Sequence, residues 1–361
     1  ASREGAAVLL LERSINLGGL ATAGLVSWYE PLCDGRGSQM IYGIAEELIR
    51  LAVKYSFDTL PEKWGGSSNS TKRERYATLF SPTVFMTALD QYVLENHVTL
   101  RFDSLVTYPV MEKNRCLGVV VESAGGREFF EGSVVVDATG NAAVMYRAGV
   151  PTVEGKNYMT YMVHYYDTEM AKDLSETGDM SSLRKWLNVG SDMLGNGQPE
   201  GQELVAGVTA EEITDYVIAG KKLLLEHTKK QDRNSFDVMA LPFMPQLRTI
   251  RRIEGDCDFE AIDGKKYKDS VGECGDFRAE GKGKHYQIPA GALYNSKFPN
   301  LIAAGRIISA PAGNGWEVSR VIPVCALTGE AAGRMAVQIV LDNKCRNNKT
   351  GKETPLYILR R

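Results

Sequence analysis

The sequence predicts an α/β protein whose core is a parallel β-sheet. Three short apolar runs carry this prediction, and each leads directly into charged, polar or glycine residues: Ala6–Leu11, Val134–Val136 and Leu301–Ala304. A strand that is buried on both faces of a parallel sheet reads as such a continuous apolar run. Ligands of open parallel sheets bind at the carboxyl ends of the strands, so the residues after these runs are candidate binding residues.

The first run ends in Glu12 and Arg13. In dinucleotide-binding folds an acidic residue at this place binds an adenosine ribose, roughly 20 residues after a glycine-rich phosphate-binding turn. No such turn precedes Glu12, and the opening residues 1–5 resemble the tail of the helix that would link the two strands. We therefore expect an N-terminally truncated chain that lacks the first strand and its turn. The alternative is a protein that starts with this strand and carries Glu12 as a surface charge.

The second run continues into Asp137, Ala138, Thr139 and Gly140. Glycine lets the backbone approach a ligand closely at the end of a parallel strand. Alone, this sequence indicates only a strand-to-helix turn. Its position between an acidic strand end and a terminal glycine–arginine segment favours a role in cofactor binding.

The third run opens the most informative segment, 301–333. Gly305 and Arg306 follow the strand, and after a polar loop a long helix starts near Val321, with small residues on one face: Ala326, Gly329, Ala332 and Gly333. Small residues at this spacing let a helix lie close to a sheet or a ligand. A helix entered through a glycine-rich loop also directs N–H groups and partial positive charge at its ligand, which suits the electron-rich edge of a flavin.

Bulk properties narrow the class of protein. The 361 residues suggest about two domains, and a hydrophobic content of 43% supports a sizeable core. No uninterrupted apolar run approaches the roughly 18 residues of a membrane span. The net charge is −3 and the basic residues are scattered, which argues against a nucleic-acid partner.

The six cysteines show neither the paired spacing of a disulfide reductase nor the pattern of a zinc or iron–sulfur site. No metal is therefore expected. Unpaired cysteines are typical of a reducing compartment, which favours the cytoplasm, although a secretion signal stays open because the N-terminus is expected to be missing.

Other patterns predict the connecting elements. Helices are expected over Ile41–Tyr55 and from Ser81-Pro82 through Asn96, with a glycine- and serine-rich loop over Asp58–Arg75 between them. A strand over Val98–Phe102 and a β-meander from Ser104 to Glu131 follow.

Four segments in this order are shared with a known family: Gly18-Gly19-Leu20-Ala21-Thr22, Val134–Gly140, Arg251–Gly255 and Leu301–Gly333. The chain resembles the FAD-dependent oxidoreductases of the glutathione-reductase-like superfamily. The resemblance implies a Rossmann-like FAD-binding domain with a parallel sheet and β-meander, made of residues 1–150 and 287–345. It would be interleaved with a mainly antiparallel α+β substrate domain of residues 151–286, and residues 346–361 would form a polar tail.

The resemblance also implies a set of FAD-binding residues. Glu12, with Arg13 beside it, would hold the adenosine ribose, and the backbone of Val106 would meet the adenine. Gly18, Gly19 and Thr22 would line the ribityl and ring region. The pyrophosphate would lie beside the turn formed by Ala138, Thr139 and Gly140. The pyrophosphate and the isoalloxazine would be flanked by residues of the terminal segment: Gly305, Arg306, Arg320 and Val321. The loop Ser309–Ser319 lacks the histidine that relatives often place there.

The middle of the chain is expected to face the flavin. Asn157–Tyr166 alternates well enough for a strand, and Ala210–Lys229 reads as a helix whose charges suit its dipole. Gln246–Ile253 reads as a strand with Arg248 and Arg252 on one face, and these arginines would grip a carboxylate or stabilise an enolate. A structural ion pair or a cofactor-phosphate contact is the alternative.

Candidates for acid–base catalysis are few. Of the four histidines, His164 in an aromatic strand and His285 before the terminal segment are the ones to test, although a structural role is the more frequent one for either. Glu317 is an alternative base near the ring.

Together these features predict an FAD-dependent oxidoreductase that transfers a hydride between a small organic substrate and flavin N5. A homo-oligomer is possible on this evidence. The alternative is a non-catalytic nucleotide-binding or scaffold protein that retains the fold.

Overall fold

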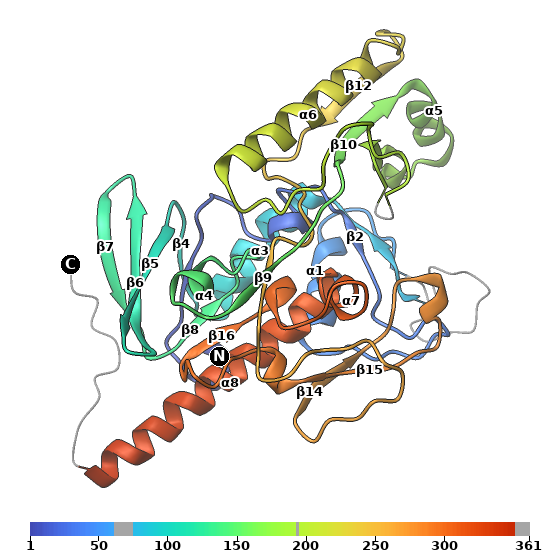
Figure 1. The fold of residues 1–361 in the computed structure, drawn as a ribbon. Coiled ribbons are helices and arrows are strands. Elements are labelled where there is room, and N and C mark those ends of the chain that lie inside the picture. The colour runs from blue at the N-terminus through green and yellow to red at the C-terminus, as the bar shows by residue number, and fades with distance from the viewer. Residues whose placement is uncertain (61–74, 193–194, 351–361) are drawn as a thin grey trace.

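The computed structural model describes residues 1–60, 75–192 and 195–350 (Figure 1). The expected loop over Asp58–Arg75 falls mostly outside the described residues, as does the chain beyond Thr350. Within the described part, helices and short strands form a main body from which a smaller unit, with α6 along one side, projects (Figure 1).

Two pairs of parallel strands form the centre of the main body. The strand β1 (Leu9–Leu11) pairs with β4 (Thr99–Arg101), and β8 (Val135–Asp137) pairs with β16 (Leu301–Ala303). The β16 side chains are buried, as expected for a strand covered on both faces. The expectation of full burial is wrong for β1, which is partly buried, and for β8, where Val136 is exposed. The pairings confirm the prediction of parallel strands at all three apolar runs, and the chain has an α/β fold.

Three helices pack around these strands. α1 (Ile44–Lys54) contacts both α3 (Pro82–Glu95) and α8 (Ile322–Thr350). The predicted start at Ile41 is wrong, because Gly43 adopts a φ of 64° and the first helical N–H, of Ile44, bonds to Glu330 of α8 at 2.9 Å. The predicted start of α3 is confirmed, with Ser81 as its cap.

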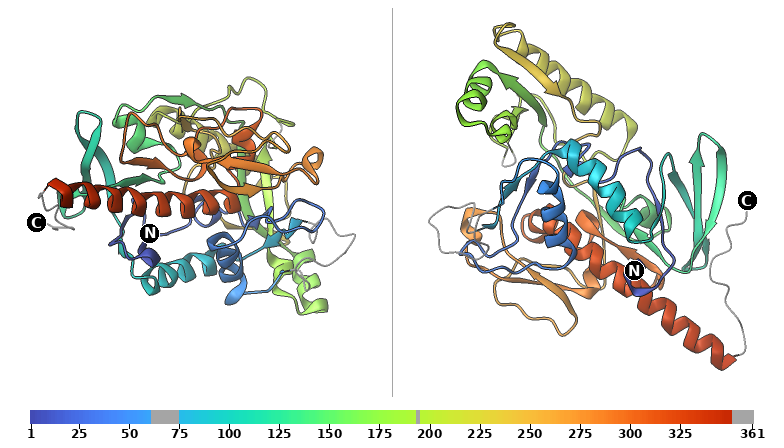
Figure 2. Two further views of the ribbon diagram at one scale, coloured as in Figure 1. Left: turned by 90° about the horizontal axis from the view of Figure 1, so that it is seen from below. Right: turned by 180° about the vertical axis from the view of Figure 1, so that it is seen from behind.

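The helix α8 runs along the β8–β16 pair and projects beyond it at its C-terminal end (Figures 1 and 2). Val324, Thr328 and Ala332 are fully buried. A methyl group at Gly329, in contrast, would have no described neighbour within 4 Å, so no described segment packs closely on this residue of the small face. Residues 346–350 continue the helix rather than starting a separate tail.

By length and composition alone, Ile322–Asn343 of α8 is also long and apolar enough to cross a membrane, with a mean hydropathy of 1.3. Core helices of soluble proteins pass the same test. Here the segment carries Glu330 and Arg334, and its buried side chains pack on the main body.

The predicted β-meander forms one antiparallel sheet of β5 (Leu105–Glu112), β6 (Arg115–Ser123) and β7 (Gly126–Glu131). Asn300 joins this sheet to the parallel strands, because its Oδ1 accepts from the Cys116 N–H at 2.9 Å and its Nδ2 donates to the Ser133 carbonyl at 2.9 Å. Asn300 is fully buried and immediately precedes β16. α4 (Ala143–Arg147) packs between β5 and β8.

The smaller unit is an antiparallel sheet in the order β11-β10-β12, formed by Lys185–Gly190, Thr160–Asp167 and Phe236–Ala240. The helix α6 (Ala210–Thr228) packs on β10 and β11, while α5 (Thr168–Thr177) continues from the end of β10. The helix predicted over Ala210–Lys229 is confirmed, and Thr209 and Glu212 cap its start reciprocally.

Short strand pairs complete the fold: β2 (Trp28–Tyr29) with β3 (Thr78–Leu79), β9 (Thr152–Glu154) with β13 (Arg251–Ile253), and β14 (Ser270–Cys274) with β15 (Tyr286–Pro289). The strand predicted over Gln246–Ile253 is wrong before Arg251. Residues 246–250 form no strand, because their hydrogen bonds go to side chains and carbonyls of other segments. Three residues of the predicted substrate domain belong to the core of the main body: Ile253, Phe259 and Cys274. The predicted domain boundaries stay a prediction.

Candidate cofactor and active site

The carboxyl ends of the parallel strands lie close together, as the sequence predicted. Gly140, after β8, adopts a φ of 73°, and a methyl group added to it would lie 2.8 Å from the Arg306 guanidinium. Only glycine therefore permits this approach. Arg13, after β1, is exposed. Its positive charge helps to lower the pKa of Arg306, which follows β16, although burial is the larger cause.

Asp137 shapes the turn at the end of β8. Its Oδ1 accepts from the N–H and the hydroxyl of Thr139, and its Oδ2 accepts from the N–H groups of Val144 and Met145 in α4. The carboxylate is buried. Ala138 and Thr139 are left exposed at the opening of the turn, where the resemblance places the pyrophosphate.

Arg306 ties three segments together. Its Nε donates to the Gly140 carbonyl at 2.6 Å, and its Nη1 donates to the Leu247 carbonyl at 2.9 Å. Its own carbonyl accepts from the buried Trp316 indole at 2.7 Å. Burial lowers the pKa of the guanidinium to about 10, which still leaves it charged near neutral pH.

Two further arginines converge on Arg306. The charge of Arg248 lowers the pKa of both Arg306 and Arg320, although burial is the larger cause in each case. None of these three arginines forms an ion pair among the residues that the structure describes. The Nε of Arg320 is buried without a hydrogen-bond partner.

This cluster fits an anionic ligand. Like charges that share a buried site repel one another, and an anion between them converts that repulsion into attraction. The pyrophosphate of FAD is such an anion, and arginine is suited to binding phosphate oxygens. The electron-rich edge of a reduced flavin would also be stabilised here.

The end of β1 fits the adenosine end of the same ligand. The Oε1 of Glu12 accepts from the N–H of Ser14 at 2.8 Å and from its hydroxyl at 2.7 Å. Its Oε2 has no hydrogen bond within the described part of the chain, so it can accept from ribose hydroxyls. Val106, whose backbone was predicted to meet adenine, lies in β5, and its carbonyl faces the Arg147 guanidinium at 3.3 Å.

The glycine turn 18–22 follows Glu12 in the chain. Gly18 and Gly19 are exposed with φ of 97° and 52°. Thr22 is fully buried, and its hydroxyl donates to the Leu17 carbonyl. Thr22 therefore supports the turn from inside, and its hydroxyl is not directed at a ligand.

The residues proposed for acid–base catalysis do not form one cluster. His164 is 1% exposed, with its Nε2 3.2 Å from the Leu25 carbonyl and 3.3 Å from the Ser27 hydroxyl. Burial lowers the pKa of His164, so its neutral form is favoured, and its Nδ1 is buried without a partner. His285 lies instead beside Asp34, with 3.4 Å between Nε2 and Oδ2.

Glu317 lies in α7 (Gly315–Ser319), a short helix within the segment predicted to be a loop. Its Oε1 accepts from the Gly313 N–H at 2.9 Å, while its Oε2 is buried without a hydrogen-bond partner. The charge of Glu317 also acts on Arg320, which places it near the arginine cluster. Val321 immediately precedes α8, as predicted.

Arg252 belongs to a structural ion pair rather than to the cluster. Its Nη1 lies 3.6 Å from Asp258 Oδ1, and its guanidinium lies over the Trp316 ring. Arg251 pairs with Glu154 in the neighbouring strand at 3.5 Å. The expectation that Arg248 and Arg252 share a strand face is wrong, because Arg248 precedes the strand.

Two buried amides near Arg248 were not singled out as functional residues in the sequence, and one of them, Asn157, contacts Arg248 directly. The Oδ1 of Asn157 accepts from the N–H groups of Arg248 and Thr249, at 2.7 and 2.9 Å. The Nε2 of Gln246 donates to the carbonyls of Gly24 and Met162, at 2.6 and 3.0 Å. Neither residue stands in a motif, so only their burial reveals them.

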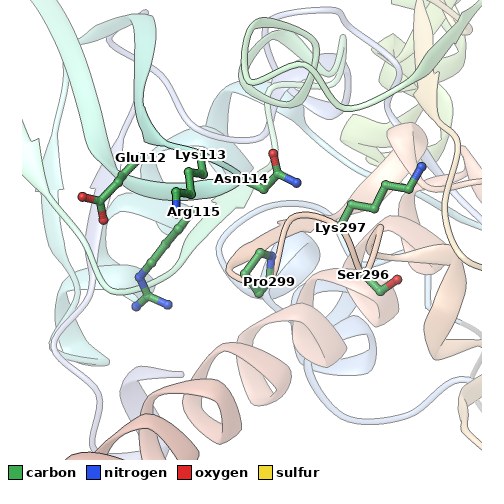
Figure 3. A pocket seen from close by; sticks show the side chains of 7 residues that line it. All are labelled: Glu112, Lys113, Asn114, Arg115, Ser296, Lys297 and Pro299. Carbon is green, nitrogen blue, oxygen red and sulfur yellow. The ribbon is translucent and has the colours of Figure 1, made fainter.

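An open pocket of about 510 Å³ lies at the opposite, amino-terminal edge of β8 and β16. It is lined by the β5–β6 turn, with Lys113 and Arg115, and by Ser296, Lys297 and Pro299. Figure 3 shows the Arg115 and Lys297 side chains pointing away from each other. Ligands bind at the other edge of parallel sheets, so this pocket is not the candidate site.

The profile of the family described as FAD dependent oxidoreductase matches residues 1–162 and 248–349, most of the chain. The chain belongs to this family. FAD is accordingly its cofactor, as the cluster at the strand ends indicates. A search of curated proteins found no match.

Several solved structures are more distantly similar to this family member. The apo Sdh1 complex of Mycobacterium smegmatis has a TM-score of 0.41 and 14% identity, over 94% of this chain and 65% of that one. CabE, an aromatic hydroxylase from angucycline biosynthesis, has a TM-score of 0.40 and 11% identity, over 94% and 63%. Glycerol-3-phosphate dehydrogenase from Bacillus halodurans, complexed with FAD, has a TM-score of 0.30 and 11% identity, over 48% and 37%. The chain thus spans less than two thirds of each of these proteins.

Proposed function

We propose that this FAD-dependent oxidoreductase family member is an enzyme that exchanges a hydride between a small organic substrate and flavin N5. The convergence of Arg248, Arg306 and Arg320 without an ion-pair partner among the described residues supports this proposal most directly. When bound, FAD supplies the two-electron chemistry. The residues of the chain supply binding, orientation and charge.

The three arginines have different roles in this proposal. Arg306 is already bonded to the Gly140 and Leu247 carbonyls, so it fixes the geometry of the turn. Arg320 and Arg248 have no side-chain hydrogen bond among the described residues. We assign Arg320 to the cofactor, because it lies in the short link between α7 and α8. We assign Arg248 to an anionic group of the substrate, because it comes from the middle segment.

Proton transfer in this proposal is assigned to Glu317, whose buried Oε2 has no hydrogen-bond partner and is free to accept a proton. His164 is a positioning residue. Its ring faces the Leu25 carbonyl and the Ser27 hydroxyl and so holds the turn that follows Thr22. His285 has no contact with the cluster and takes no part in this step.

The experiment that tests the function is a titration of the purified protein with FAD, followed by visible absorption under anaerobic conditions. We expect flavin absorption bands that disappear on reduction with dithionite and on addition of a substrate. Arg320→Gln should bind FAD at least about tenfold more weakly, the value of one charge-assisted hydrogen bond. Arg127→Gln, on the exposed face of β7, is the matched control.

The result also distinguishes an enzyme from a scaffold. Bound FAD that dithionite reduces but that no substrate reduces in a broad screen would favour the non-catalytic nucleotide-binding protein. A protein that binds no FAD would contradict the proposed function.

A further inference from the structure

A second cavity, of about 500 Å³, shares no residue with the arginine cluster. It lies where the chain after α1 and the start of α3 meet the smaller unit. Its walls are mainly apolar and are formed by Phe57, Val84, Met180, Leu183 and Met239, with Arg184 as the charged residue. Cavities of this size and character hold small organic ligands.

Arg184 is unusual in this setting. Its Nη2 lies 3.4 Å from the Ser81 hydroxyl oxygen, and its Nη1 lies 3.9 Å from the Met239 sulfur. No carboxylate pairs with it anywhere in the described ranges. Partial burial lowers the pKa of its guanidinium, a sign that losing water costs free energy which no neighbouring anion offsets.

Ser81 adds a second polar group to the same wall. Its hydroxyl oxygen accepts from the Val84 N–H at the start of α3, at 3.5 Å. Ser81 itself is fully buried, so its hydroxyl holds the Arg184 guanidinium in place and does not meet a ligand. The guanidinium of Arg184, with its parallel N–H donors, matches a group that carries a single negative charge and two acceptor oxygens.

We propose that this cavity binds a small amphipathic carboxylate. The carboxylate would accept hydrogen bonds from Arg184, and an aliphatic or aromatic body would pack on Phe57 and the two methionines. Methionine side chains are flexible, so they adapt to bodies of different shape. This ligand site is separate from the flavin chemistry and does not depend on the proposed function.

Isothermal titration calorimetry of the FAD-loaded protein with sodium decanoate tests this proposal. Decylamine, which carries the same chain and the opposite charge, is the matched probe. We expect saturable binding of decanoate at one site and none of decylamine, because Arg184 would repel the ammonium group. Decanoate that does not bind at millimolar concentration, or decylamine that binds equally well, would overturn the proposal.

Variants separate a specific site from general binding to apolar surface. Arg184→Gln should weaken decanoate binding at least about tenfold, while the exposed Arg233→Gln should not change it. Val84→Phe, which fills the cavity and keeps Arg184, should also weaken it. Circular dichroism and the visible spectrum confirm that each variant is folded and retains FAD. Equal decanoate affinity in Arg184→Gln and in the unaltered protein would refute the assignment.

Discussion

At the scale of single residues, buried polar groups hold this protein in shape. Asp137 and His164 are both about 1% exposed, but they respond differently to their surroundings. The Asp137 carboxylate accepts four hydrogen bonds, which tie the turn after β8 to the start of α4. His164 has one ring nitrogen without a partner, and burial favours its neutral form.

Replacing Asp137 with alanine should destabilise the protein by about 3 kcal/mol or more, because the donors in this buried turn lose their acceptor. Urea denaturation followed by circular dichroism measures the change. Asp173→Ala, on the exposed side of α5, is the matched control and should change stability by less than about 0.5 kcal/mol. A loss at Asp137 no greater than at Asp173 would contradict the role given to this carboxylate.

His164 should make the protein less stable in mild acid. Since its folded pKa is lowered, the unfolded chain binds a proton first as the pH falls below the ordinary histidine value of about 6.5. Stability from this residue is fully present above that value and is lost towards the lowered folded pKa, by up to about 1.4 kcal/mol per pH unit. Urea denaturation at several pH values should show a smaller slope in His164→Gln. The exposed His97→Asn should keep the slope of the unaltered protein.

At the scale of elements, helices approach their neighbours at some glycines and not at others. A methyl group on Gly220 of α6 would lie 2.4 Å from the buried Tyr161 ring in β10, whereas one on Gly329 of α8 would meet nothing within 4 Å. Both glycines are inside helices, where alanine is intrinsically better by about 1 kcal/mol. The packing around each glycine, and not the helix propensity, therefore decides whether alanine raises or lowers the free energy of unfolding.

The two substitutions should have opposite effects on the free energy of unfolding. Gly220→Ala should destabilise the protein by about 1–3 kcal/mol, because Tyr161 must move in a packed interior. Gly329→Ala should stabilise it by up to about 1 kcal/mol. Thermal denaturation of both variants beside the unaltered protein checks this. A gain in stability from Gly220→Ala would show that α6 does not pack on β10 as described.

At the scale of the whole molecule, three arginines from distant parts of the chain converge. Arg248 comes from the middle segment, while Arg306 and Arg320 flank the terminal loop. Their mutual repulsion opposes the folded arrangement until a ligand balances it. Ligand binding to the folded state alone then adds stability, by about 2.7 kcal/mol at a ligand concentration of 100 times Kd.

Inorganic pyrophosphate should therefore raise the melting temperature of the FAD-free protein, and it should do so less in Arg320→Gln. Differential scanning fluorimetry over a pyrophosphate series measures both. Sodium chloride at equal ionic strength is the control, since screening alone acts without a specific site. An equal rise in the two proteins would mean that the anion binds elsewhere.

Several features of the fold followed from the sequence. The three parallel strands, the meander, α3, α6 and α8 were predicted because burial on both faces, alternation and capping residues are patterns within a short stretch of chain. The order of the motifs also identified the FAD-binding family. The start of α1 at Ile44 and the helix α7 were not predicted, because the acceptor for the Ile44 N–H, Glu330, lies far away in the sequence.

The sequence by itself thus determined the strands, the turns that follow them and the cofactor, since each depends on local residue order. Only the tertiary structure decided which side chains are left without partners. It brought Arg248 to Arg320, buried His164 under the Leu25–Ser27 turn and placed Arg184 in an apolar cavity. Charge balance and burial depend on every neighbour in space, and those neighbours come from segments that no local pattern connects.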